Sequence, residues 1–482
     1  MLPRSFAAHH SPLATGLVPC SGHACQKHPS TKTAIRARGN RTSALLRGIP
    51  GSVWSTQNLR PRRCNSRRKA TSGAVSRRAC RDIRAEVAGS VGGRSDGRGI
   101  GTSEVSAWPA SMTAMSETPN SSTTTLSVAE PLTVLDLFAG AGGMTAGFHA
   151  AGGFRTVKAV EMDAVAAASY RATFGDIVEV DDVGHWLVAG EVPSVDVVVG
   201  GPPCQGFSTL GMQDIEDRRN RLWHDYAQVI VRATPSYFVL ENVAAFRRSP
   251  QFGALHQETL ARGLLADYEI EDAVLNAADY GAAQARRRAI IIGHHRDLPA
   301  PGIAEPTHME LHRTVRQALE SVGRRPIEPE LPDRATAVDG RRQPGVFTTE
   351  ELHVGRTYTA TSMARIRSIP VGGNRFDIPD LLLAPCWRKH KSGSADVMGR
   401  LHWDRPSVTI RTEFFKPEKG RYLHPTEHRA LTHYEAALLQ GFPPTHKWVG
   451  SKVAVARQIG NAVPLQLAQA IASQLRQAHE ER

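Results

Sequence analysis

Short apolar runs alternate with amphipathic stretches between Thr133 and about Pro299. The runs have the length of buried strands, and the stretches between them have the periodicity of helices. Repeated β-α units of this kind build an α/β fold around a mostly parallel sheet. The pattern predicts strands at Thr133–Phe138, Thr156–Val160, Val195–Val199, Ser236–Leu240, Tyr268–Leu275 and Arg288–Gly293, with helices at Gly142–Ala151 and Leu222–Ala233.

The alternation weakens after Pro299, where Pro, Arg and Gly interrupt shorter segments up to about Pro425. Such punctuation is typical of loops and turns. We therefore expect a main domain at 131–302, followed by a smaller, loop-rich domain at 303–430.

The closing segment, 431–482, carries signals for two helices. One follows Thr432, because Glu435 three residues later completes a capping box. The other begins at Pro464, a residue favoured in the first turn of a helix. Its apolar positions recur every four residues and predict a face that packs on the main sheet: Val463, Leu467, Ile471 and Leu475.

Residues 1–125 differ from the rest because they lack sustained hydrophobic periodicity. Residues 1–115 hold 19 Lys and Arg against four acidic residues, which leaves 40 basic and 42 acidic residues in 116–482. The net charge of +13 is therefore a property of the leader, and the remainder is near neutral. We expect the leader to be disordered and dispensable, with an organelle transit peptide or a true start at Met112 or Met115 as alternatives.

The six cysteines give no disulfide or zinc pattern. Four lie in the leader, and only Cys204 and Cys386 lie beyond it. No apolar run is long enough to span a bilayer. The N-terminus also lacks the charged segment followed by an apolar one that is typical of a secretory signal. These features favour a cytoplasmic protein and argue against secretion or membrane insertion.

The first chemical motif is the glycine-rich turn at Asp136–Gly143, where a predicted strand runs into a helix. Glycines there allow close approach of a ligand to the backbone, and the helix N-terminus offers free N–H groups. Glu161 ends the next strand, where a carboxylate can hold ribose hydroxyls. A purely structural turn is the alternative for the glycines alone, and Glu161 favours a nucleotide-like cofactor.

The second motif is Pro202–Ser208, which follows a predicted buried strand and contains Cys204. An isolated cysteine is more often a small buried apolar residue than a nucleophile. Here the prolines and glycines around it indicate a rigid turn at the carboxyl edge of the sheet, where α/β folds bind ligands. We therefore expect Cys204 to be a positioned nucleophile.

Two further motifs also lie at strand ends: Glu241–Val243 and Gln284–Arg288. A strand-end Glu or an Arg run is by itself more often a solvated surface feature. Placed at the same edge as Cys204, they supply an acid and guanidinium donors beside a nucleophile.

These four motifs, in this order, resemble those of DNA cytosine-5 methyltransferases that depend on S-adenosylmethionine. The resemblance covers about residues 131–476 and continues in three later segments: Arg405–Ile410, Gln440–Pro443 and Gln458–Pro464. It implies a doubly wound, Rossmann-like catalytic domain, a target-recognition domain and a C-terminal helix that returns to the first. It also implies S-adenosylmethionine as cofactor, held by Phe138, Gly140, Gly142, Glu161, Asp182, Pro203 and Asn461, with Asp176 as the alternative to Asp182.

The resemblance further implies a mechanism. Cys204 adds to C6 of a cytosine flipped out of the duplex, Glu241 neutralises charge in the ring, and Arg288 with Arg286 donates to O2. Gly206–Arg221 is the expected mobile loop that closes over the DNA.

Double-stranded DNA is the expected partner, and a near-neutral body must bind it through local basic surface. The candidates are Arg365, Arg367, Arg375, Arg388, Lys389, His390, Lys391, Arg411 and Lys416, with Trp387 beside them. Ordinary solvated charges are the alternative for about half of these. We expect 303–430 to select the sequence that is methylated.

Two alternatives concern function. An RNA cytosine-5 methyltransferase would share the catalytic motifs, but its relatives usually carry a Cys-Phe-Thr tripeptide, whereas Cys386 precedes Trp387 and Arg388 here. A catalytically silent DNA-binding relative would have lost the nucleophile or the acid. A cognate restriction endonuclease is a candidate functional partner, and the chain itself is expected to be a monomer.

Overall fold

The computed structural model describes residues 130–203, 222–323, 326, 328–389 and 392–482. The expected leader, the expected nucleophile Cys204, the loop Gly206–Arg221 and the basic residues His390 and Lys391 lie outside this part of the chain. Among the described residues, no helix is both long and apolar enough to cross a membrane.

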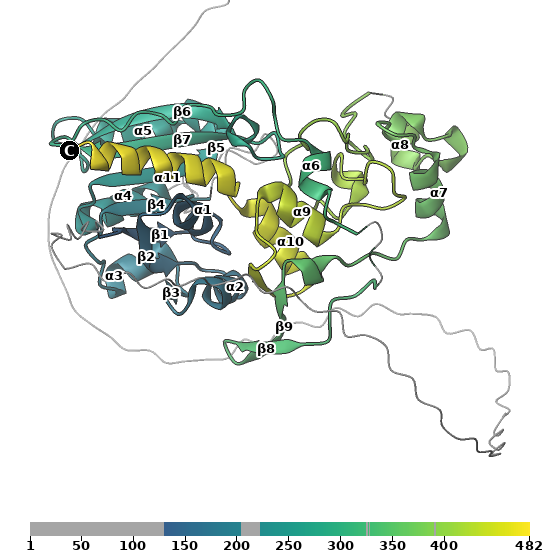
Figure 1. The fold of residues 1–482 in the computed structure, drawn as a ribbon, viewed down its shortest axis with the longest axis horizontal. Helices are drawn as coiled ribbons and strands as arrows, with labels where there is room; N and C mark the ends of the chain where they lie inside the picture. Colours follow the sequence, from purple (N-terminus) through teal and green to yellow (C-terminus); the bar gives the residue numbers. More distant parts are fainter. Residues whose placement is uncertain (1–129, 204–221, 324–325, 327, 390–391) are drawn as a thin grey trace, which may run out of the picture. The chain divides into compact units, whose positions relative to one another are not determined.

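A seven-stranded, mostly parallel sheet forms the centre of the described chain (Figure 1). Its strands, in spatial order, are β3 (Val178–Glu179), β2 (Phe154–Val160), β1 (Leu132–Leu137), β4 (Val197–Gly200), β5 (Tyr237–Val243), β7 (Arg287–His295) and β6 (Tyr268–Asn276). Only β7 runs against its neighbours, β5 and β6. The predicted α/β fold is confirmed, and every predicted strand is present, with bounds that differ by at most three residues; the largest difference is at β5, which ends at Val243 rather than Leu240.

Successive side chains along each strand point to opposite faces of this sheet. In β1, Val134 joins a core formed with α1 (Gly143–Ala151) and α11 (Leu465–Glu480). Leu135, one residue later, joins a core formed with α3 (Val183–Ala189), α4 (Leu222–Ala233) and α5 (Pro250–Glu258). Because both faces are covered by helices, the strands are apolar on both sides.

The C-terminal segment contains three helices rather than the predicted two: α9 (His433–Gln440), α10 (Lys452–Asn461) and α11. The capping box of Thr432 and Glu435 is confirmed. Pro464 is the N-cap of α11, because its ψ of 130° is extended, and the helix therefore begins one residue later than predicted. The predicted apolar face is confirmed, since its four residues are buried in the core shared with α1 (Figure 1).

Residues 303–430 hold short elements around small cores. They are α6 (Val315–Leu319), β8 (Ala335–Val338), β9 (Arg341–Thr348), α7 (Ala360–Ser368) and α8 (Pro385–Lys389). Strand β9 pairs with both β8 and β10 (Lys447–Val449). In Figure 1, α7 and α8 lie at the opposite end of this unit from the seven-stranded sheet.

The part of the chain that the structure describes also contains α2 (Ala164–Phe174), beside β2 and β3, and six short 3-10 turns. The turns span Ala244–Arg248, Ala277–Tyr280, Glu350–Leu352, Arg375–Asp377, Asp380–Leu382 and Pro417–Lys419. The boundaries 131–302, 303–430 and 431–482 remain predictions about domains.

Candidate active site

A pocket of about 640 Å³ lies at the carboxyl ends of β1, β2, β4 and β5. Its wall is completed by residues of β7 and α10 and by the segment 409–412. The predicted site residues among its lining are Phe138, Gly140, Glu161, Pro203, Glu241, Arg286, Arg288 and Asn461. Four separate sequence motifs therefore meet at one edge of the sheet, as expected.

The glycine-rich turn after β1 has the backbone of a ligand cradle. Phe138, Gly140 and Gly142 have φ angles of 55°, 58° and 87°, a conformation that favours glycine. A Cβ at Gly140 would meet no atom within 4 Å, whereas one at Gly142 would lie 2.2 Å from the ring of Phe174. Gly140 thus leaves open space on the pocket side, and Gly142 lets α2 pack closely.

Glu161 connects this turn to the next strand. Gly140 N donates to its Oε2 at 2.8 Å, and Asp163 N donates to its Oε1 at 2.7 Å. Burial raises the pKa of Glu161, and these N–H donors oppose the rise. The carboxylate therefore fixes the glycine turn while it lines the pocket.

Asp136 forms the floor of the pocket and is 1% exposed. Its Oδ2 accepts a hydrogen bond from Thr145 Oγ1 at 2.6 Å, and that hydroxyl lies 2.8 Å from Tyr170 Oη. Burial raises the pKa of Asp136 to about 7, against the opposing effect of Thr145. Sequence reasoning missed Thr145 and Tyr170, because neither belongs to the glycine motif.

We expect Asp136→Asn to remove a pH-dependent contribution to stability. The unfolded carboxyl titrates near 3.8 and the folded one near 7, so the folded state holds the proton more tightly. The wild-type free energy of unfolding should therefore fall, relative to the variant, as pH rises through this window, by ~4 kcal/mol at most. Urea unfolding at pH 5 and pH 8 measures this difference, with Asp176→Asn as an exposed control. Parallel pH profiles of wild type and Asp136→Asn would contradict it.

Glu241 and Arg288 form a nearly buried ion pair at the pocket wall. Arg288 Nε lies 2.7 Å from Glu241 Oε1, and the side chains are 13% and 11% exposed. The contact lacks the alignment of a hydrogen bond, so this Glu241 oxygen keeps its accepting capacity. Antiparallel pairing of β5 with β7 produces the meeting, since Val243 is opposite Arg288.

The neighbouring Asn242 connects β5 to the turn that precedes Cys204. Its Nδ2 donates to Pro202 O at 3.0 Å, and the side chain is buried. Pro203, the residue before Cys204 in the chain, lines the same pocket. The strand that carries Glu241 thus also fixes the turn that leads to Cys204.

Arg286 is fully buried, and much of its guanidinium is used structurally. Its terminal nitrogens donate to Ile410 O at 2.9 Å and to Gly460 O at 3.0 Å. Burial, helped by Arg288, lowers the pKa of Arg286 to about 9. Its Nε is buried and has no hydrogen-bond partner among the described residues, and the residue is part of the pocket lining.

Gln284 connects motifs that are far apart in the sequence. It donates to Gln440 Oε1 at 2.7 Å and accepts from Ile410 N at 2.7 Å. Gln440 in turn donates to Ile459 O. This buried network brings 410 and α10 to the wall of the pocket.

Two predicted cofactor residues lie outside the pocket lining: Gly142 and Asp182. Asp182 caps α3 by accepting from Gly184 N and His185 N. The alternative, Asp176, is exposed and pairs with Arg171 at 2.6 Å. Their roles toward a cofactor remain predictions. The pocket is also lined by residues that sequence analysis did not single out, among them Met162, Asp163, Thr412 and Arg457.

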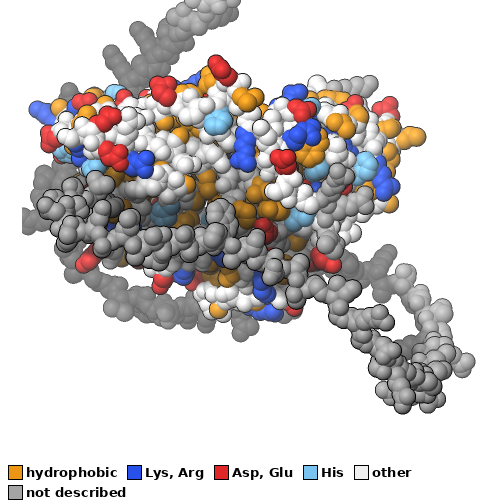
Figure 2. Space-filling model, in the orientation of Figure 1, with side chains coloured by type: hydrophobic (Ala, Val, Ile, Leu, Met, Phe, Trp, Pro, Cys, Tyr) orange, Lys and Arg blue, Asp and Glu red, His pale blue; other side chains and the backbone are white. Residues whose placement is uncertain are grey.

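Several of the basic residues expected to contact DNA already form hydrogen bonds or ion pairs within the protein. Arg365 Nε donates to Leu382 O at 2.5 Å, and Arg375 is only 6% exposed and donates to Ser392 O at 2.6 Å. Arg411 donates to Tyr422 Oη and lines the pocket, while Lys416 pairs with Glu413. On the face in Figure 2, basic and acidic side chains are mixed rather than gathered into one field.

Comparison with known proteins identifies the family of this chain. Residues 132–477 match the family C-5 cytosine-specific DNA methylase. The chain is 34% identical to Type II methyltransferase M1.HphI of Haemophilus parahaemolyticus over 350 residues, which is 71% of this chain and 86% of the relative. It is 32% identical to Type II methyltransferase M.XorII of Xanthomonas oryzae pv. oryzae, over 71% of this chain and 84% of the relative.

The fold has a counterpart among solved structures. A structure from E. coli, described as a DNA modification methyltransferase encoded within a prophage, superposes with a TM-score of 0.55 and 24% identity. The match covers 72% of this chain and 99% of the other. The chain belongs to the C-5 cytosine-specific DNA methylase family, a family of enzymes, and its sheet is that of a Rossmann-like methyltransferase.

Proposed function

We propose that this protein transfers a methyl group from S-adenosylmethionine to C5 of a cytosine in a specific sequence of double-stranded DNA, with Cys204 as the nucleophile. The observation that carries the proposal is the buried Glu241–Arg288 pair in the same pocket as the glycine turn. An acid and a cation at one wall suit an electron-poor ring, and a glycine cradle at the other suits a nucleotide-like cofactor.

The residues would act in sequence on the cytosine ring. The Cys204 thiolate bonds to C6, and the ring electrons move to C5, which becomes nucleophilic. Glu241 shares a proton with N3 as negative charge develops there, while Arg288, with Nε of Arg286, donates to O2. After C5 gains the methyl group, it loses its proton to a base, and the electron pair returns to the ring and expels Cys204.

The pocket fits the methyl donor. Glu161 offers carboxylate oxygens for ribose hydroxyls, and open space beside Gly140 admits the rest of the molecule. Phe138, Pro203 and Asn461 line the same volume, and we propose that Gly142 and Asp182, which are not part of the lining, also contribute to cofactor binding. When bound, the cofactor supplies an electrophilic methyl on a positively charged sulfur.

The DNA substrate sets further requirements. C6 is inaccessible inside a duplex, so the target base must be flipped out, at a cost of about a few kcal/mol. The Type II relatives suggest a role in restriction and modification, beside a cognate endonuclease, in the compartment that holds the DNA. We propose a monomer. An RNA substrate is disfavoured, because the relatives at 34% and 32% identity are named as Type II methyltransferases.

Bisulfite sequencing of plasmid DNA from a host that expresses this chain tests the proposal. We expect cytosines within one short sequence to resist conversion, and cytosines outside it to convert. Complete conversion everywhere, with the protein soluble and abundant, would contradict the proposal. Resistance confined to host RNA would instead select the RNA alternative.

Deletion of residues 1–114 should leave a folded enzyme with unchanged sequence specificity. The leader lacks a hydrophobic pattern and lies outside every motif, and residues 130–482 contain complete cores of their own. Its positive charge should strengthen only non-specific DNA binding at low salt. Methylation rates and bisulfite patterns of the full and shortened chains, at moderate salt, provide the measurement. An inactive or insoluble shortened chain would show that the leader is structural.

A further inference from the structure

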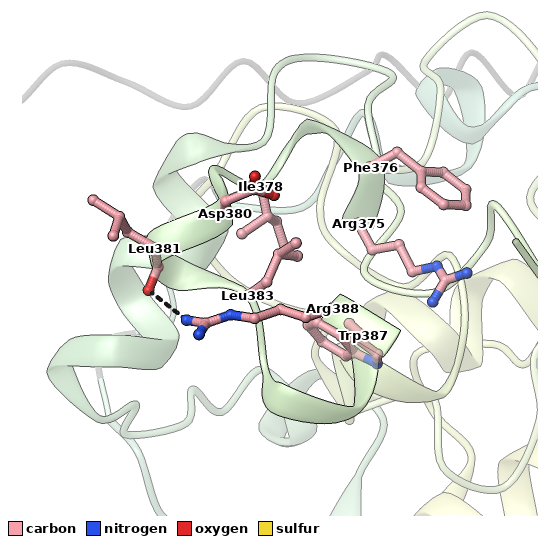
Figure 3. Close-up of a pocket in the computed structure, with 8 residues that line it drawn as sticks. All are labelled: Arg375, Phe376, Ile378, Asp380, Leu381, Leu383, Trp387 and Arg388. Carbon is pink, nitrogen blue, oxygen red and sulfur yellow. Dashed lines mark hydrogen bonds between the residues drawn. The ribbon is translucent and has the colours of Figure 1, made fainter. Parts of the chain in front are cut away.

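A second pocket, of about 440 Å³, lies within residues 375–388 (Figure 3). It shares no lining residue with the candidate active site. Its volume falls within the range of about 300–1,000 Å³ that is typical of pockets for small molecules. The lining consists of Arg375, Phe376, Ile378, Asp380, Leu381, Leu383, Trp387 and Arg388.

Apolar and aromatic side chains form most of this wall. Ile378 is buried in a small core, and Leu383 and Trp387 pack against the same core. Two large apolar side chains remain exposed at its edge, Phe376 at 52% and Leu381 at 92%. Exposed apolar groups beside a hollow of this size indicate a binding surface rather than a folding requirement.

The polar groups of the wall are mostly donors. Arg375 is 94% buried, since its exposed fraction is 6%, and its Nε has no hydrogen-bond partner among the described residues. The guanidinium is engaged within the protein, because Nη2 donates to Ser392 O at 2.6 Å and the group lies over the Phe376 ring at 4.5 Å. Arg388 adds a second guanidinium, bonded to Leu381 O at 3.3 Å (Figure 3).

Flat rings with acceptor atoms on their edges match this wall. A nucleobase has apolar faces that stack on an indole, and N or O acceptors that arginine commonly reads. The surrounding charge suits a polyanion, because residues 360–389 contain five basic side chains and two acidic ones. The target cytosine has its own place beside Glu241 and Arg288, so this pocket would hold a different base.

We propose that this second pocket receives one further nucleobase, displaced from the DNA helix at a position other than the target cytosine. The inference rests on the proposed function, because its ligand is the duplex DNA that the protein is proposed to methylate. The base would stack on Trp387, and the exposed guanidinium of Arg388 would donate to its acceptor atoms or to its phosphate.

The test is a binding scan with the full-length protein and duplexes that carry one abasic site at a time, on either strand of the methylated sequence. A displaced base has a distinctive signature. Removing that base deletes the ligand of the pocket, and we expect Kd to rise about tenfold. Removing its pairing partner makes displacement cheaper, and we expect Kd to fall several-fold. A base pair that is read in a groove should instead bind more weakly after either removal.

Opposite changes in Kd after removal of the two bases of one pair are called the asymmetry of that pair. We expect it at the target pair and at one other pair. Trp387→Ala should abolish it only at the second pair, and Trp387→Phe should retain it. Arg388→Ala should weaken it there, whereas Lys389→Ala, the adjacent residue on α8 that does not line the pocket, should not. Arg388 is exposed, so Arg388→Ala should fold. It therefore tests the pocket even if Trp387→Ala fails to fold.

Two results would overturn the inference. One is asymmetry at the target pair alone. The other is asymmetry at a second pair that persists in both Trp387→Ala and Arg388→Ala. Either result leaves the methylation pattern intact, whereas absence of methylated cytosine refutes the proposed function itself.

Discussion

Cys204→Ala is expected to abolish methyl transfer, lowering the single-turnover rate by at least about four orders of magnitude. Without the thiolate, no bond forms at C6, and C5 stays too poor a nucleophile to take a methyl group. Affinity for S-adenosylmethionine should stay within a few-fold of wild type, because the glycine turn and Glu161 are untouched. Rapid-quench methylation and isothermal calorimetry measure the two quantities.

Cys386→Ala is the matched control, because Cys386 is an exposed free cysteine. It should methylate at the wild-type rate. Transfer by Cys204→Ala at a rate near that of Cys386→Ala would rule out covalent catalysis through Cys204.

Glu241→Gln should reduce the single-turnover rate by about two to three orders of magnitude. The amide cannot share a proton with N3 as a carboxyl group does, and it no longer balances the charge of Arg288 2.7 Å away. DNA affinity should change by only a few-fold, since the main effect is on charge that develops during the reaction. Single-turnover kinetics and fluorescence anisotropy separate these effects.

Glu269→Gln provides a comparison on the same sheet, because Glu269 also pairs with an arginine, Arg296, but is half exposed on β6. Its rate should equal that of wild type. Equal rates for the two variants would remove Glu241 from the reaction.

Alternation of apolar residues explains how much of the sheet could be predicted. Strands buried on both faces, such as β4 and β5, stand out from the helices that flank them. The two-residue β3 is too short for any period to be visible. Strand β9 begins Arg341-Arg342-Gln343-Pro344, and its identity as a strand depends on pairing with β8 and β10 rather than on its own composition.

Contacts between residues far apart in the sequence limit how much of the site could be predicted. The glycine turn, Glu241 and the Gln284–Arg288 motif could be assigned to one edge of the sheet from topology alone. The bonds from Arg286 to Ile410 and Gly460 join residues 124 and 174 positions apart, which no local pattern encodes. For the same reason, Arg375 was expected on a basic, DNA-contacting surface and is buried in the structure.

The most direct test of the account is the identity of the modified nucleoside. Purified full-length protein is incubated with duplex DNA and S-adenosylmethionine that carries an isotopically labelled methyl group, and the DNA is then digested to nucleosides for mass spectrometry. The account predicts the label in 5-methyldeoxycytidine alone, and its loss in Cys204→Ala. Label in an N-methylated base, or 5-methyldeoxycytidine formed equally well by Cys204→Ala, would contradict it.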